Sequence, residues 1–182
     1  LRTQRLREKG HPLLGAKQVA DLERFLRDAE GARHVVLVCS VPIAHVPRSL
    51  VGRISRWIDS ANEFDDRWEA PQFRSDQDHV LSLIDRLRER SPQTRVLVAA
   101  GDIHVGSLQR IRRIDTGAEF LQLISSPFSH RQSALERGIA RLAFVPHALF
   151  DPSDGPHVDV ELVRGEGMHH NPTADLNFAM VD

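Results

Sequence analysis

The chain has 182 residues, enough for one domain with a sizeable hydrophobic core. Its 24 basic and 25 acidic side chains nearly cancel, which argues against a nucleic-acid-binding patch. The single cysteine, Cys39, excludes an internal disulfide, and no apolar run is long enough for a transmembrane segment. Because the chain starts at Leu1 rather than Met and stops at Asp182 within a strand-like segment, we expect both ends to be cut, which leaves the compartment open.

The first half of the chain predicts a helix, a strand and a second helix. Residues 16–30 place apolar side chains such as Phe25 on one stripe, and Gly31 ends that helix. Residues 34–40 form an apolar run that is typical of a buried strand, and residues 48–62 are again amphipathic.

A long acidic and aromatic segment precedes the third predicted helix. Residues 63–74 show no helical period, so we expect a loop there. Ser75 is expected to open the helix, with Asp78 three residues later as a variant of the capping box. Ser91 and Pro92 are expected to end it.

The second half of the chain is rich in strand-like runs. Residues 95–100 are expected to form a strand whose apolar run, residues 96–100, carries charge on neither face, which is typical of a fully buried strand. The later predicted elements are a hairpin of residues 108–114 and 119–124, a short helix at 133–142, and strands at 158–163 and 176–181. This order predicts an α/β layered sandwich with a mixed sheet.

The clearest chemical signal comes directly after strand 95–100, where Gly101, Asp102, Ile103 and His104 interrupt the apolar run. Open α/β sheets carry their ligand sites just beyond the carboxyl ends of such strands. In extended backbone, alternate side chains point to the same side, so Asp102 and His104 would face one cavity as metal ligands. The alternative is that Asp102 caps a turn and His104 lies at the rim without a role.

Two further segments offer candidate substrate-binding side chains. His45 follows strand 34–40 and would share a sheet edge with Asp102 if the two strands are parallel. Asp66 and Trp68 lie in the long loop, and loops of that length in a small domain are often functional. The alternative for this loop is a solvated acidic turn with Trp68 packed against the core.

Five segments between residues 13 and 130 carry a further pattern. They are LLGAKQVADLERFL, HVVLVCSVPIAHVP, DDRWEAPQFRSDQDHVLSLIDRL, VLVAAGDIHVGSLQRI and FLQLISSPFSH. In this order they resemble motifs of the PhoD-like metallophosphoesterases, the alkaline phosphatase D type. The specific matches are GDIH, which is similar to the family's SGDVH segment, and the D-x-W sequence that ends at Trp68.

The resemblance implies a metallophosphoesterase fold that uses two metal ions to hydrolyse phosphate monoesters or diesters. It implies Asp102 and His104 as metal ligands in the catalytic centre, with Asp66 and Trp68 in the loop that borders the substrate. The metal ions would be divalent or trivalent cations. Carboxylate and imidazole ligands suit iron, manganese, zinc or calcium, and the spacing does not choose among them. Such hydrolases are typically bacterial and often exported.

Other ligand motifs of the wider superfamily are missing. Apart from Asp102-Ile103-His104 itself the chain has no D-x-H, and it has neither G-D-x-x-D nor G-N-H-[DE]. We therefore expect residues 1–182 to be the C-terminal part of a single PhoD-like domain. The fragment alone is expected to be inactive, because a half-filled ligand set binds metal weakly. The alternative is a catalytically silent binding domain of the same fold.

Overall fold

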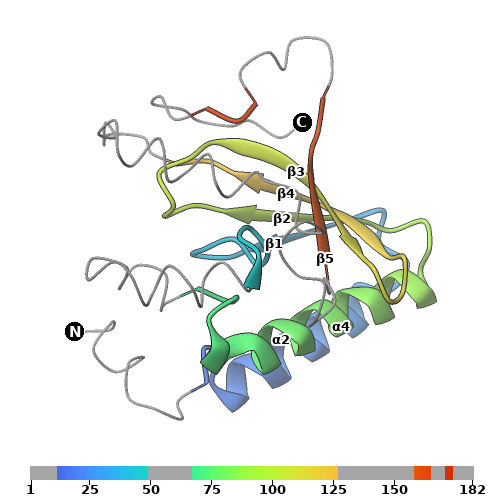
Figure 1. The fold of residues 1–182 in the computed structure, drawn as a ribbon. Coiled ribbons are helices and arrows are strands. Elements are labelled where there is room, and N and C mark those ends of the chain that lie inside the picture. Colours follow the sequence, from blue (N-terminus) through green and yellow to red (C-terminus); the bar gives the residue numbers. More distant parts are fainter. Residues whose placement is uncertain (1–11, 49–66, 127–157, 165–170, 174–182) are drawn as a thin grey trace. The chain divides into compact units, whose positions relative to one another are not determined.

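The computed structural model describes residues 12–48, 67–126, 158–164 and 171–173 (Figure 1). Its contacts divide the chain into a helical unit, Leu1–Val35 with Arg48–Arg95, and a sheet unit, Val36–Pro47 with Val96–Asp182. All of the predicted helix at 48–62 except Arg48 lies outside the described residues. So do the predicted helix at 133–142 and the predicted strand at 176–181.

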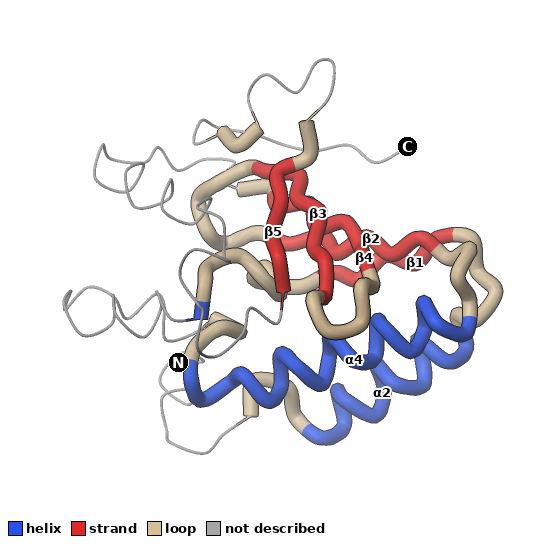
Figure 2. Tube along the Cα trace, turned by 45° about the vertical axis from the view of Figure 1, so that its right-hand side comes forward, coloured by secondary structure: helices blue, strands red, loops and turns tan. Residues whose placement is uncertain are grey.

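The helical unit is built on two helices that lie side by side and run in the same direction (Figure 2). They are α2 (Ala16–Asp28) and α4 (Arg74–Arg90). Near their starts the Leu13 backbone N–H donates to the Asp76 carboxylate at 2.5 Å, and near their ends Arg90 pairs with Glu30 at 2.8 Å. These contacts fix the parallel arrangement of the pair.

The predicted apolar stripe of α2 is only partly buried. Leu26 is buried, but Phe25, which we expected on the same inward stripe, is 48% exposed. The helix ends at Asp28, two residues earlier than predicted. Gly31 then adopts a φ of 86°, a left-handed conformation that suits glycine just past the end of a helix.

The capping box predicted at Ser75 is wrong. A short 3₁₀ turn, η2 (Pro71–Phe73), leads directly into α4, which begins at Arg74 without a side-chain cap. The carboxylate of Asp78 instead pairs with Arg48 at 2.5 Å. The backbone has already turned before Ser75, so Asp78 serves a tertiary contact rather than a helix end.

The five described strands form one open mixed sheet with the order β1-β2-β4-β3-β5 (Figure 1). They are β1 (His34–Val38), β2 (Arg95–Ala100), β3 (Ser107–Arg113), β4 (Glu119–Ile124) and β5 (Val158–Leu162). β2 is parallel to β4, whereas β3 is antiparallel to both β4 and β5. Backbone hydrogen bonds from Arg95 to Arg33 and from Cys39 to Ala99 place β1 parallel to β2. The predicted α/β fold with a mixed sheet is therefore confirmed.

One face of the β3–β4 hairpin is buried and contains a pair of polar residues. Gln109 lies opposite Gln122, between the pairs Ser107–Ile124 and Ile111–Phe120. Gln109 and Gln122 are both 0% exposed. Buried amides of this kind need hydrogen-bond partners, which the loop after β1 supplies.

The prediction that residues 96–100 are buried on both faces of the strand is wrong. Val96 and Val98 are buried, but Leu97, Ala99 and Ala100 are only half-buried. Cys39, expected inside the preceding strand, follows its last residue and is half-buried. Burial raises the pKa of the Cys39 thiol to about 11, so the thiol is protonated and unreactive at neutral pH.

Candidate functional site

The loop after β2 has an unusual backbone. Asp102 has a φ of 58° and His104 a φ of 57°, so both adopt the left-handed conformation. Extended backbone was expected there, and the structure contradicts that expectation. Left-handed backbone costs a residue with a side chain about 1 kcal/mol, and such residues cluster at functional sites.

A small apolar cluster holds this backbone in place. Ile103, between the two left-handed residues, is 7% exposed and packs with Val105 and Ile124. Asp102 is exposed and His104 is half-buried. The apolar members therefore anchor the loop and leave the Asp102 carboxylate exposed, whereas the Nδ1 of His104 is buried.

Hydrogen bonds to neighbouring segments tie down both ends of the loop. The His104 N–H donates to the Ser126 hydroxyl at 3.2 Å, and the Ser125 N–H donates to Ala100 at 3.0 Å. Gly106 exchanges two 2.8 Å backbone hydrogen bonds with Thr173. The loop is thus fixed to the end of β4 and to residues 171–173.

Asn171 strengthens that second attachment. Its side chain accepts from the Leu108 N–H at 3.0 Å and donates to the carbonyls of Leu108 and Val163 at 2.8 Å each. It therefore joins the first residues of β3 to the end of β5. Nothing in the local sequence pattern predicted this role, because the partners are distant along the chain.

The donor chemistry of the loop suits a metal ion only in part. A carboxylate and an imidazole are ligands that zinc, manganese and iron accept. Among the residues that the structure describes, however, no group of three or more His, Cys, Asp or Glu side chains is placed to hold a metal. A metal bound at Asp102 and His104 would need further ligands from outside the described ranges.

His45 lies in a different setting from the one expected. β1 and β2 are parallel, as the prediction for His45 required, but its side chain is 3% exposed rather than open at the sheet edge. Its Nδ1 lies 3.1 Å from the amide nitrogen of Gln109. The loop folds back over a face of the sheet and places the imidazole against the middle of β3.

The backbone of this loop determines which ring nitrogen of His45 carries the proton. The Gln122 oxygen accepts from the N–H of Ile43 at 2.9 Å, and its nitrogen donates to the Ala44 carbonyl at 2.6 Å. The same nitrogen donates to the Gln109 oxygen at 2.7 Å. Gln109 must then present its nitrogen to His45, so Nδ1 accepts a hydrogen bond and the neutral ring carries its proton on Nε2.

The local sequence pattern did not single out these two glutamines. Gln122 shares the inward face of β4 with the apolar residues Phe120 and Ile124, and that placement was the available signal. Gln109 gave less signal, because Ser107 and Arg113 lie on the same face of β3. An isolated glutamine in a strand would be exposed more often than buried, so the pattern became informative only once the pairing of β3 and β4 was known.

The remaining candidates belong to the acidic loop. Trp68 is part of the helical unit and is 5% exposed, which matches the alternative that it packs into the core. Its indole nitrogen is buried without a hydrogen bond in the described structure. Glu69, next to it, is 2% exposed. Asp66 lies outside the described residues.

Comparisons with known proteins give one structural likeness. No protein-family model matches the sequence, and no curated protein matches it. A solved structure titled "Structure of PhoD" superposes with a TM-score of 0.47 and 16% sequence identity, covering 88% of this chain and 28% of that one. The chain thus spans less than a third of that protein's length.

In the described part of the chain, no helix has both the length and the apolar character that crossing a membrane requires.

Proposed function

We propose that this chain is the C-terminal part of the catalytic domain of a PhoD-like metallophosphoesterase, which hydrolyses phosphate monoesters or diesters. The observation that carries the proposal is the loop after β2. There a GDIH sequence at the carboxyl end of a parallel strand holds Asp102 and His104 in left-handed backbone on an anchored and accessible loop. Strained and well-supported residues of this kind are typical of functional sites.

In this proposal Asp102 and His104 are metal ligands, and the other ligands come from elsewhere in the intact protein. Two bound metal ions would supply charge neutralisation at the phosphate and an activated hydroxide. The chain itself would contribute the Asp102 carboxylate and the His104 imidazole on a backbone that is already fixed before a metal binds. The cluster of Ile103, Val105 and Ile124 fixes the backbone between and beside them, so little conformational entropy is lost when a metal binds.

Of the predicted substrate contacts, Asp66 stays a prediction. Trp68 and His45 are 5% and 3% exposed, so we assign them structural roles, Trp68 in the core of the helical unit and His45 in the hydrogen-bond chain through Gln109 and Gln122. Because the Nδ1 of His45 accepts from Gln109, this ring is not assigned as a metal ligand either.

The test is a phosphatase assay of the intact protein with added metal. Asp102→Asn and His104→Ala are each expected to lower kcat/KM by more than about 100-fold, because each removes a ligand. Exposed residues provide matched controls, namely Asp28→Asn and His34→Ala, which should leave turnover unchanged. Undiminished turnover in the Asp102 and His104 variants would remove the assignment.

One observation favours the second candidate, a catalytically silent binding domain of the same fold. It is that the described residues contain no group of three or more metal-ligand side chains. If the intact, folded protein takes up no metal and hydrolyses no phosphate ester, that candidate replaces the phosphoesterase.

A further inference from the structure

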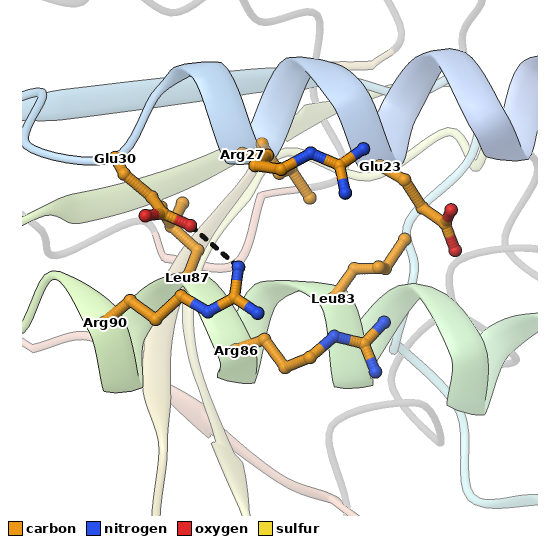
Figure 3. A pocket seen from close by; sticks show the side chains of 8 residues that line it. Glu23, Arg27, Glu30, Leu83, Arg86, Leu87 and Arg90 are labelled. Carbon is orange, nitrogen blue, oxygen red and sulfur yellow. Dashed lines mark hydrogen bonds and ion pairs between the residues drawn. The ribbon is translucent and has the colours of Figure 1, made fainter.

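Three arginines surround a hollow between α2 and α4 (Figure 3). The hollow has a volume of about 230 Å³. Its floor consists of three buried leucines, Leu26, Leu83 and Leu87. Charged side chains form its rim, namely Glu23, Arg27, Glu30, Arg86 and Arg90. All of them belong to the helical unit.

Both carboxylates on the rim are already engaged. Glu30 pairs with Arg90 at 2.8 Å, the contact drawn in Figure 3, and Glu23 contacts His79 at 3.2 Å. Glu23 precedes Arg27 by four residues, which is the spacing of a helical ion pair. Because Glu23 contacts His79 instead, Arg27 is left without that partner.

The side chains of Arg27 and Arg86 form no ion pair or hydrogen bond with any residue in the described ranges. Both side chains are exposed, and they extend from the two helices on either side of Leu83 in the view of Figure 3. The two positive charges beside one hollow repel each other, and an anion bound between them adds two attractive interactions that offset this repulsion. Guanidinium groups suit phosphate, because two parallel N–H donors match two of its oxygens.

We propose that this hollow binds a phosphate group, free or esterified, between Arg27 and Arg86. Its volume is below the roughly 300 Å³ at which pockets for drug-sized ligands begin, so the occupant is small. The leucine floor provides apolar contact for the first carbon atoms of an ester. The site lies apart in sequence from Asp102 and His104, and the proposal does not depend on the phosphoesterase activity.

The experiment is a titration of the 182-residue chain in metal-free buffer at low ionic strength, with NMR of the arginine Nε–Hε groups as readout. The chain carries Asp102→Asn and His104→Ala, so that the loop after β2 contributes no metal-assisted binding. Inorganic phosphate and phenyl phosphate are the two probes. Saturable shifts of Arg27 and Arg86 are expected with either, and tighter binding of phenyl phosphate would identify an ester as the natural occupant.

Three further variants test the charge argument. Arg27→Gln with Arg86→Gln is expected to weaken binding by at least about tenfold, because hydrogen bonds to charged groups are lost. Glu23→Gln is expected to tighten binding, since it removes a nearby negative charge. The matched control is Arg24→Gln on the same helix, whose arginine already pairs with Asp21 at 2.5 Å and should alter affinity less than twofold.

Two results would overturn the proposal. One is the absence of saturable binding by either probe while circular dichroism shows a folded chain. The other is an Arg24→Gln variant that loses as much affinity as the double variant, because the chain would then attract phosphate through its general surface charge rather than through this hollow.

Discussion

Two loops follow neighbouring parallel strands of the sheet, and they differ in burial and in backbone conformation. Residues 42–47, after β1, are all buried. Residues 101–106, after β2, expose Asp102 and contain two left-handed residues. Each loop carries a histidine, yet His45 is fixed inside a polar network whereas His104 is half-buried on a strained loop. A histidine after a strand is thus not by itself the sign of a site.

The difference between the loops arises from what satisfies their backbone. The buried loop has its Ile43 N–H and its Ala44 carbonyl bonded by the side chain of Gln122. The loop after β2 has the His104 N–H bonded by Ser126 and depends on Ile103 for its apolar anchor. The first arrangement stabilises the fold, and the second holds an unfavourable backbone open to ligands.

The largest effect on stability is expected from a substitution that removes the Gln122 amide, which supports the buried loop. Gln122→Ala leaves the Ala44 carbonyl and the Ile43 N–H without their partner, and we expect the free energy of unfolding to fall by about 3 kcal/mol. Chemical denaturation measures it. Gln93→Ala, on an exposed residue, should change stability by less than about 0.5 kcal/mol. Equal effects from the two variants would show that the buried loop does not depend on Gln122.

The second prediction concerns the tautomer of His45. Nitrogen-15 NMR of the ring should show an unprotonated Nδ1 and a protonated Nε2. Gln109→Leu removes the donor to Nδ1, so both tautomers of the ring should then be populated. The free energy of unfolding should fall by about 1–2 kcal/mol. A protonated Nδ1 in the unaltered protein would refute the hydrogen-bond chain described above.

The third prediction tests the strain in the loop after β2. Glycine adopts positive φ without penalty, so Asp102→Gly and His104→Gly should each raise stability by up to about 1 kcal/mol while removing a proposed ligand. Asp28→Gly, in the last turn of α2, should have the opposite sign and cost about 0.5–1 kcal/mol. Thermal unfolding compares the three. If the loop glycines destabilise the chain, the left-handed backbone is not the source of strain.

The smallest effect on stability is expected in the turn between β3 and β4, which lies outside both loops and serves as a comparison. A hydrogen bond from Arg113 lowers the pKa of Asp115 to about 2, from a usual 3.8. The folded state therefore gains stability above about pH 4, and this gain is lost as the pH falls towards 2. Since the Asp115 side chain is 52% exposed, Asp115→Asn should cost less than about 1 kcal/mol at pH 7. A difference between the variant and the parent that persists at pH 2 would contradict this account.

The amino-acid sequence was enough to predict several local elements. It predicted strand β2 with its observed bounds, the hairpin of β3 and β4, and a mixed sheet, because apolar periodicity and turn residues act over a few neighbours. It also drew attention to Asp102 and His104 as the polar interruption at the end of a buried run.

The tertiary fold, by contrast, assigned the roles of the polar residues. It buried Gln109 and Gln122, turned His45 inward, gave Asp102 and His104 positive φ, and placed Asp78 on Arg48 rather than on a helix end. Each outcome depends on a partner supplied by a segment distant along the chain or on the packing of a loop around its apolar members. Local propensity does not contain that information, because the free energy of a buried polar group is set by the partner it finds.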